Sequence, residues 1–155
     1  MARTSPVSEA PKRSRMRKAR KYALDILYSA DLTDVSVEEA IDNYRGMSDH
    51  DTPDYSLTLV NGVVDNVEVI DGYLTPSLGN DWSVTRMATI DRCLARIAVF
   101  EMVYADLPPA VAISEAVSLA KELSTDASAS FLTGALGHVA TLIPRTEAET
   151  VEKTG

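Results

Sequence analysis

Hydrophobic residues recur at three- and four-residue steps along most of this chain, which is the spacing of one face of an α-helix. A first helix is predicted from about Arg15 to Asp31 by Met16, Ala19, Ala23, Ile26, Leu27 and Ala30. A second is predicted to begin near Ser36, which can cap it, and to stop near Gly46. Almost no segment alternates as a half-buried strand does, so the pattern indicates an all-α protein.

The middle of the chain is harder to divide. A third helix is predicted from Thr52 or Asp54 to about Leu74, although Gly62 and several valines within it are poor helix formers. Pro76 and the turn at residues 79–81 then mark the most plausible division of the chain. A short amphipathic turn over residues 82–87 follows.

Three further helices are predicted in the second half, over residues 89–104, 111–123 and 127–143. Ser124 or Asp126 can cap the last of them, and its Gly134 and Gly137 are expected to let a neighbouring element approach closely. Glu101 stands out because it falls on the apolar face of its helix, where a buried carboxylate needs a partner.

The predicted organisation is one helical domain built from two packed three-helix halves. The halves span residues 13–76 and 82–144, within a domain that covers residues 13–144. Residues 1–12 are expected to be a disordered basic arm, because they combine prolines with small polar residues. Residues 145–155 are expected to be a flexible acidic tail.

Charge changes this picture, because eight of the fifteen lysines and arginines lie in the first 21 residues, in a chain of net charge −8. On the first helix a basic stripe borders the apolar face and ends in an aromatic ring; it consists of Arg13, Arg17, Arg20, Lys21 and Tyr28. Cations in a first helical turn oppose the helix dipole, so helix stability does not require them. Phosphate binding, with the ring stacking a base, is the favoured interpretation.

Two other interpretations of the basic segment stay open. It can be a solvated arm, or one that lies on the acidic remainder of the chain. A membrane surface is disfavoured because alanines, rather than Trp or Phe, lie beside the charges.

Catalytic and metal-binding patterns are not found in the sequence. Cys93 is the only cysteine and lies in a helical apolar pattern, while His50 and His138 lie far apart. No Gly-rich phosphate loop or nucleophile elbow occurs. We therefore expect no enzyme activity, no metal and no cofactor. With no signal peptide or long apolar run in the sequence, we expect a cytoplasmic protein with no membrane contact.

Three segments in order resemble the NusB family of bacterial transcription antitermination factors. They are RMRKARKYALDILYSADL (15–32), TIDRCLARIAVFEM (89–102) and VAISEAVSLAKELSTDASASFLTGALG (111–137). The resemblance implies an all-helical fold of two three-helix halves whose first helix contacts single-stranded boxA RNA. It also implies a heterodimer with the small-subunit ribosomal protein that acts as NusE. The pair would join elongating RNA polymerase during rRNA transcription.

The resemblance assigns roles to particular positions. Candidate RNA-binding residues, from the stripe and the family pattern together, are Arg13, Arg15, Arg17, Lys18, Arg20, Lys21, Tyr28, Ser128 and Phe131. Candidate contacts to NusE are Thr85, Arg86 and Asp91, on a face expected to be separate from the RNA surface. Core packing is the alternative for Tyr28 and Phe131, simple capping for Ser128, and surface solvation for the three NusE candidates.

The chain departs from the family pattern at two positions near the expected RNA surface. Thr133 replaces the usual asparagine of F-V-N-G, and Ala127 replaces an acid before Ser128. The affinity of the chain for RNA and the RNA sequence that it prefers are therefore left open. Also open are a homodimer through the first helix, as in some relatives, and two competing functions. These are an accessory module like that of rRNA cytosine methyltransferases, and a purely structural helical adaptor.

Overall fold

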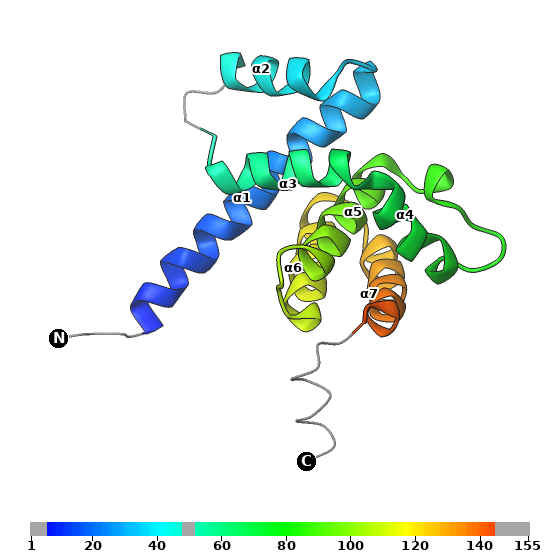
Figure 1. Cartoon of the computed structure of the whole chain (residues 1–155). Helices are drawn as coiled ribbons and strands as arrows, with labels where there is room; N and C mark the ends of the chain where they lie inside the picture. Colours follow the sequence, from blue (N-terminus) through cyan, green and yellow to red (C-terminus); the bar gives the residue numbers. More distant parts are fainter. Residues whose placement is uncertain (1–5, 48–51, 145–155) are drawn as a thin grey trace.

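A computed structural model describes residues 6–47 and 52–144, and all of its regular structure is helical (Figure 1). The seven α-helices in these ranges are α1 Pro6–Thr33, α2 Val37–Met47, α3 Asp54–Asp65, α4 Val67–Leu74, α5 Thr89–Val103, α6 Pro109–Leu123 and α7 Asp126–Leu142. Two short 3-10 turns, η1 Thr75–Ser77 and η2 Val84–Arg86, lie between α4 and α5. The all-α prediction is confirmed.

The helices pack in two groups around α5. Helix α1 packs against α2 and α3 in the first group, and α5, α6 and α7 pack against one another in the second. The groups meet where α1, α3 and α4 lie against α5, and the N-terminal part of α1 extends away from the rest (Figure 1). One continuous core runs through both groups, with Ile26, Leu59, Ile70, Leu94 and Leu132 fully buried.

Several predicted helix ends were wrong. Helix α1 begins at Pro6 instead of near Arg15, so residues 6–12 are helical, while residues 1–5 and 145–155 lie outside the described residues. The predicted third helix is split at Asn66, whose side-chain amide donates to the Gly62 carbonyl at 2.8 Å. The last helix is capped by Thr125, whose hydroxyl accepts from the backbone N–H of Ser128. The Ser36 cap is confirmed by a 3.1 Å bond from the Glu39 backbone N–H.

One glycine permits the close approach of α3 to α5, and it is not one of those predicted. A Cβ at Gly62 would overlap the ring of Phe100, which is 7% exposed and stacks on Tyr104. Gly134 and Gly137 have nothing within 4 Å of the corresponding positions, so the expected close approach at α7 is wrong. Cys93 is buried in the core, as predicted, and burial raises the pKa of its thiol to about 11.

Within the described ranges, no helix is long and apolar enough to cross a membrane. No group of histidines, cysteines and acidic residues there has the arrangement of a metal site.

Candidate nucleic-acid interface

The exposed positive charge of α1 lies on its N-terminal half. Arg13, Arg15 and Lys18 are exposed, and none of them forms an ion pair with a carboxylate in the part of the chain that the structure describes. Helix geometry places Arg15 and Lys18 on one side of α1 and Arg13 on nearly the opposite side, on a segment that projects from the bundle (Figure 1). Arg15 and Lys18 can therefore approach neighbouring phosphates of one nucleic acid strand.

Two other cations of the predicted stripe are held by an acid on α6. Glu122 accepts from Arg17 at 2.6 Å and from Lys21 at 2.6 Å, and Arg17 also donates to the Ser118 hydroxyl at 2.9 Å. Hydrogen bonds from Lys21 and Arg17 lower the pKa of the exposed Glu122 carboxyl. The carboxylate therefore occupies the position between the two cations that a phosphate oxygen would need.

Arg20 is not a surface residue, which corrects its assignment to the RNA-binding set. It is 4% exposed, and its Nε lies 3.1 and 3.0 Å from the two oxygens of Glu101. Its Nη1 reaches Glu115 at 3.4 Å. The helical spacing that grouped Arg20 with Arg17 was right, but α5 and α6 cover that edge of the stripe. Arg20 is thus a structural residue.

The partner that Glu101 was predicted to need is therefore Arg20, with Tyr55 of α3 as a second donor at 2.5 Å. Burial raises the pKa of the Glu101 carboxyl, and the charge of Arg20 opposes that shift. Burial, together with the hydrogen bond to Glu101, raises the pKa of Tyr55. This cluster joins α1, α3 and α5 through side-chain hydrogen bonds.

The two aromatic candidates lie in different surroundings. Tyr28 is half-buried on α1, so one edge of its ring can pack against the protein while the other stays accessible to a ligand. Phe131, on α7, is 36% exposed and meets Trp82 edge to face, with ring centroids 6.4 Å apart. Trp82 is 41% exposed, and the guanidinium of Arg86 lies 5.1 Å from the centre of its ring.

The expectation of separate RNA and NusE faces is wrong for the residues around this aromatic pair. Asp91, a NusE candidate, is 8% exposed and accepts from the hydroxyl of Ser128, an RNA candidate, at 2.6 Å. Ser124 donates to the other Asp91 oxygen at 2.9 Å. Thr85 and Arg86 are exposed on η2. Asp91, Ser128, Trp82 and Phe131 line one hollow of about 190 Å³ between the α5 and α7 N-termini.

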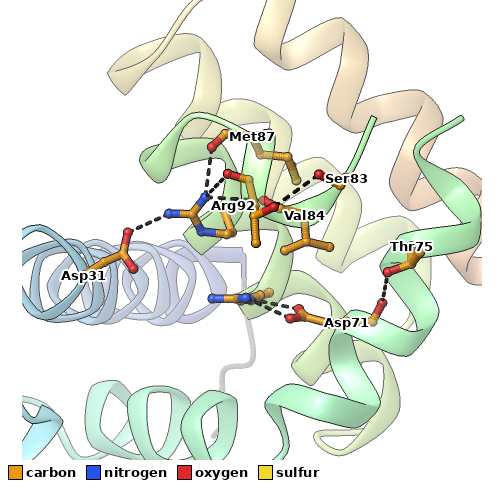
Figure 2. A network of polar contacts seen from close by, with 9 residues as sticks. Asp31, Asp71, Thr75, Ser83, Val84, Met87 and Arg92 are labelled. Atoms are coloured by element: carbon orange, nitrogen blue, oxygen red, sulfur yellow. Dashed lines mark hydrogen bonds and ion pairs between the residues drawn. The ribbon is translucent and has the colours of Figure 1, made fainter. Parts of the chain in front are cut away.

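Arg92 fastens the segment that carries Trp82 and Arg86 to the bundle. Its guanidinium donates to the carbonyls of Met87 at 2.9 Å and Val84 at 3.3 Å, and to the carboxylate of Asp31 on α1 at 2.6 Å (Figure 2). One turn further along α5, Arg96 donates two hydrogen bonds, of 2.9 and 2.8 Å, to the carboxylate of Asp71 on α4. Hydrogen bonds from Arg92 thus hold the loop between α4 and α5, while the two ion pairs tie α5 to α1 and to α4.

Sequence reasoning did not single out Trp82, Arg92 or Glu122. Trp82 carried a usable signal, because a tryptophan in a turn flanked by polar residues is a common anchor for binding. Glu122 and Arg92 carried none, since each looks like an ordinary helix-surface charge until its partner from a distant segment is known.

Comparison with known proteins shows that this chain belongs to the NusB family, whose family model matches residues 17–141. It is 45% identical to the transcription antitermination protein NusB of Salinispora tropica over 128 residues, which cover 80% of this chain and 93% of that protein. It is 42% identical to the NusB of Nocardioides sp. over 123 residues, covering 79% of this chain and 90% of the relative.

Solved structures agree on the fold. A crystal structure of T. maritima NusB superposes with a TM-score of 0.74 at 24% identity, covering 88% of this chain and 96% of that one. A crystal structure of the antitermination factors NusB and NusE in complex with double-stranded RNA superposes with a TM-score of 0.71 at 22% identity. In that case 82% of this chain and 96% of the other are covered.

Proposed function

We propose that this chain is a non-enzymatic transcription antitermination factor that binds boxA-type single-stranded RNA together with the ribosomal protein NusE. The pair joins elongating RNA polymerase during rRNA transcription, which places the protein in the cytoplasm. The observation that carries the proposal is the group of exposed cations on the projecting half of α1, in a chain whose net charge is −8 and whose family is NusB.

The RNA surface follows from the side chains that remain accessible. Arg13, Arg15 and Lys18 contact phosphates directly, and Arg17 and Lys21 do so when Glu122 releases them. Tyr28 and Phe131 offer rings to unpaired bases, because phosphates alone carry no sequence information. Ser128 contributes through its position beside Phe131, with its hydroxyl already engaged by Asp91.

NusE is assigned to the outer side of the η2 region through the exposed Thr85, whereas Arg86 lies over the Trp82 ring. Asp91 supports this surface from beneath, because its carboxylate is buried and bonded to Ser124 and Ser128. The complex of a related NusB with NusE and RNA, at 22% identity, supports the choice of partners but not the contacts.

Salt dependence of RNA binding tests the electrostatic part. Each phosphate contact contributes roughly −0.7 to the slope of the logarithm of the binding constant against the logarithm of the salt concentration. With about four contacts, we expect a slope of about −3. Fluorescence anisotropy of a labelled boxA strand, titrated at several salt concentrations with and without NusE, gives this slope. We expect tighter binding with NusE, since few phosphate contacts form without it. A flat salt response would contradict the proposal.

Charge variants locate the surface. Arg15→Ala and Lys18→Ala should each weaken RNA binding and reduce the slope by about 0.7, with little change in melting temperature. Arg45→Ala is the matched control, because it removes one exposed positive charge from α2. Equal losses in Arg15→Ala and Arg45→Ala would show that only net charge matters. Arg15→Ala and Lys18→Ala should both retain NusE in a pull-down performed with and without RNase.

A further inference from the structure

The hollow between the α5 and α7 N-termini has the composition of a base-stacking site. Its walls are the exposed faces of Trp82 and Phe131, with Met87 between α5 and η2. Its volume of about 190 Å³ exceeds the ~150 Å³ cavity that admits benzene in another protein. The hollow is therefore large enough for one six-membered aromatic ring.

The polar groups around the hollow suit a nucleotide better than an apolar side chain. The Arg86 guanidinium lies over Trp82 at 5.1 Å and is exposed, so it can reach a phosphate while stacked on the ring. Asp91 and Ser128 provide polar groups at the inner side. Each Asp91 oxygen accepts one serine hydroxyl and keeps a second lone pair, which can accept an N–H from a base edge.

The hollow is also held in shape before any ligand arrives. Arg92 donates to the carbonyls of Val84 and Met87 (Figure 2). Arg86 donates to the Asp81 carbonyl at 2.9 Å. A site that is already ordered loses little conformational freedom on binding.

From this geometry we infer that Trp82 and Phe131 line a pocket for one unpaired nucleobase of the bound RNA, with Arg86 over the Trp82 ring. The inference rests on the proposed function and adds a residue that the basic surface of α1 does not contain. Bases stack on aromatic side chains whatever their sequence, and the N–H acceptor of Asp91 then favours a base with an amino group at its edge.

Trp82 is the only tryptophan of the chain, so its fluorescence reports on this pocket directly. The probe is a short boxA-type single strand, together with strands of equal length in which one base after another is replaced by an abasic residue. We expect the intact strand to quench Trp82 fluorescence in the unmodified protein. One abasic position should abolish the quenching while the strand still binds.

Trp82→Leu keeps an apolar cover over the hollow and removes the stacking face. It should weaken binding of the intact strand about five- to 140-fold, which corresponds to the ~1–3 kcal/mol of one base–aromatic stack at 1.4 kcal/mol per tenfold. The strand abasic at the position found by fluorescence should bind both proteins equally. Tyr104→Leu, at an exposed tyrosine at the end of α5, is the matched control and should leave RNA binding unchanged.

The outcomes separate this inference from the proposed function. If RNA binds with the expected salt slope but neither quenches Trp82 nor discriminates Trp82→Leu, the base pocket is wrong and the proposed function stands. If NusE alone changes Trp82 fluorescence and RNA does not, the hollow is a protein contact and the inference is again wrong. If no RNA binds in the presence of NusE, the proposed function itself fails.

Discussion

The hydroxyl of Ser128 on α7 donates a 2.6 Å hydrogen bond to the carboxylate of Asp91 on α5, so the N-terminal ends of these two helices are joined by one contact. Asp91 is buried, and the Ser128 hydroxyl accepts in turn from the hydroxyl of Thr125 at 2.9 Å. Residues expected to serve different ligands are therefore coupled through the protein itself.

This coupling is measurable by a double-mutant cycle. Ser128→Ala and Asp91→Asn should each lower the free energy of unfolding, and the double variant should lose less than the sum by about 0.5–3 kcal/mol. Urea denaturation of the four proteins gives the interaction energy. Ser130→Ala, an exposed serine on the same helix, should change stability little. Additive losses would mean that the 2.6 Å contact contributes nothing between α5 and α7.

Glu122 is expected to compete with RNA for Arg17 and Lys21. Glu122→Gln removes the carboxylate from between the two cations, so RNA affinity should rise about two- to fivefold, in keeping with the small strength of exposed ion pairs. Glu68→Gln, at an exposed acid on α4, is the control for net charge. Anisotropy titrations of both variants measure the effect.

The pH dependence of this difference follows from the pKa of Glu122, which Lys21 and Arg17 lower. A carboxyl with a lowered pKa stays ionised throughout the range above its ordinary value. The advantage of Glu122→Gln over the unmodified protein should therefore be constant between about pH 8 and pH 5. An advantage that disappears well above pH 5 would contradict the role of the carboxylate.

Arg20 is expected to matter for stability and not for direct RNA contact. Arg20→Ala leaves the buried Glu101 carboxylate without its charge partner, which should cost about 3–5 kcal/mol of unfolding free energy. The double variant Arg20→Met with Glu101→Leu removes both charges and should recover most of that loss. Calorimetric melting of the three proteins tests this, and RNA affinity of the folded double variant should be close to normal. A loss of RNA binding there would restore Arg20 to the interface.

Gly62 is expected to tolerate no side chain. Gly62→Ala puts a methyl group into the buried ring of Phe100, so it should destabilise the protein by about 1–3 kcal/mol despite the better helix propensity of alanine. Gly72→Ala, in α4 with open space around it, should be neutral or stabilising by up to ~1 kcal/mol. The two melting temperatures should therefore move in opposite directions, or only that of Gly62→Ala should fall.

The helices were predictable from the sequence where the signal is local. The α5 and α6 segments carry regular apolar spacing, and Ser36 caps α2 as its position before two acids indicates. The break at Asn66 and the start of α1 at Pro6 were not predicted, because helix ends depend on contacts that propensity does not describe. Phe131 was singled out as an RNA-binding candidate with core packing as the alternative, but its partner Trp82 lies 49 positions away along the chain and was not singled out.

By itself the sequence determined the all-helical class, the order of the helices and the gathering of positive charge on the first of them, because periodicity, caps and composition are properties of neighbouring residues. Only the tertiary structure decided which of those charges is available. Arg20 is covered by Glu101, 81 residues away, and Arg17 by Glu122, 105 residues away. A helical wheel gives the direction of each side chain, but what faces it is set by the packing of α5 and α6 against α1.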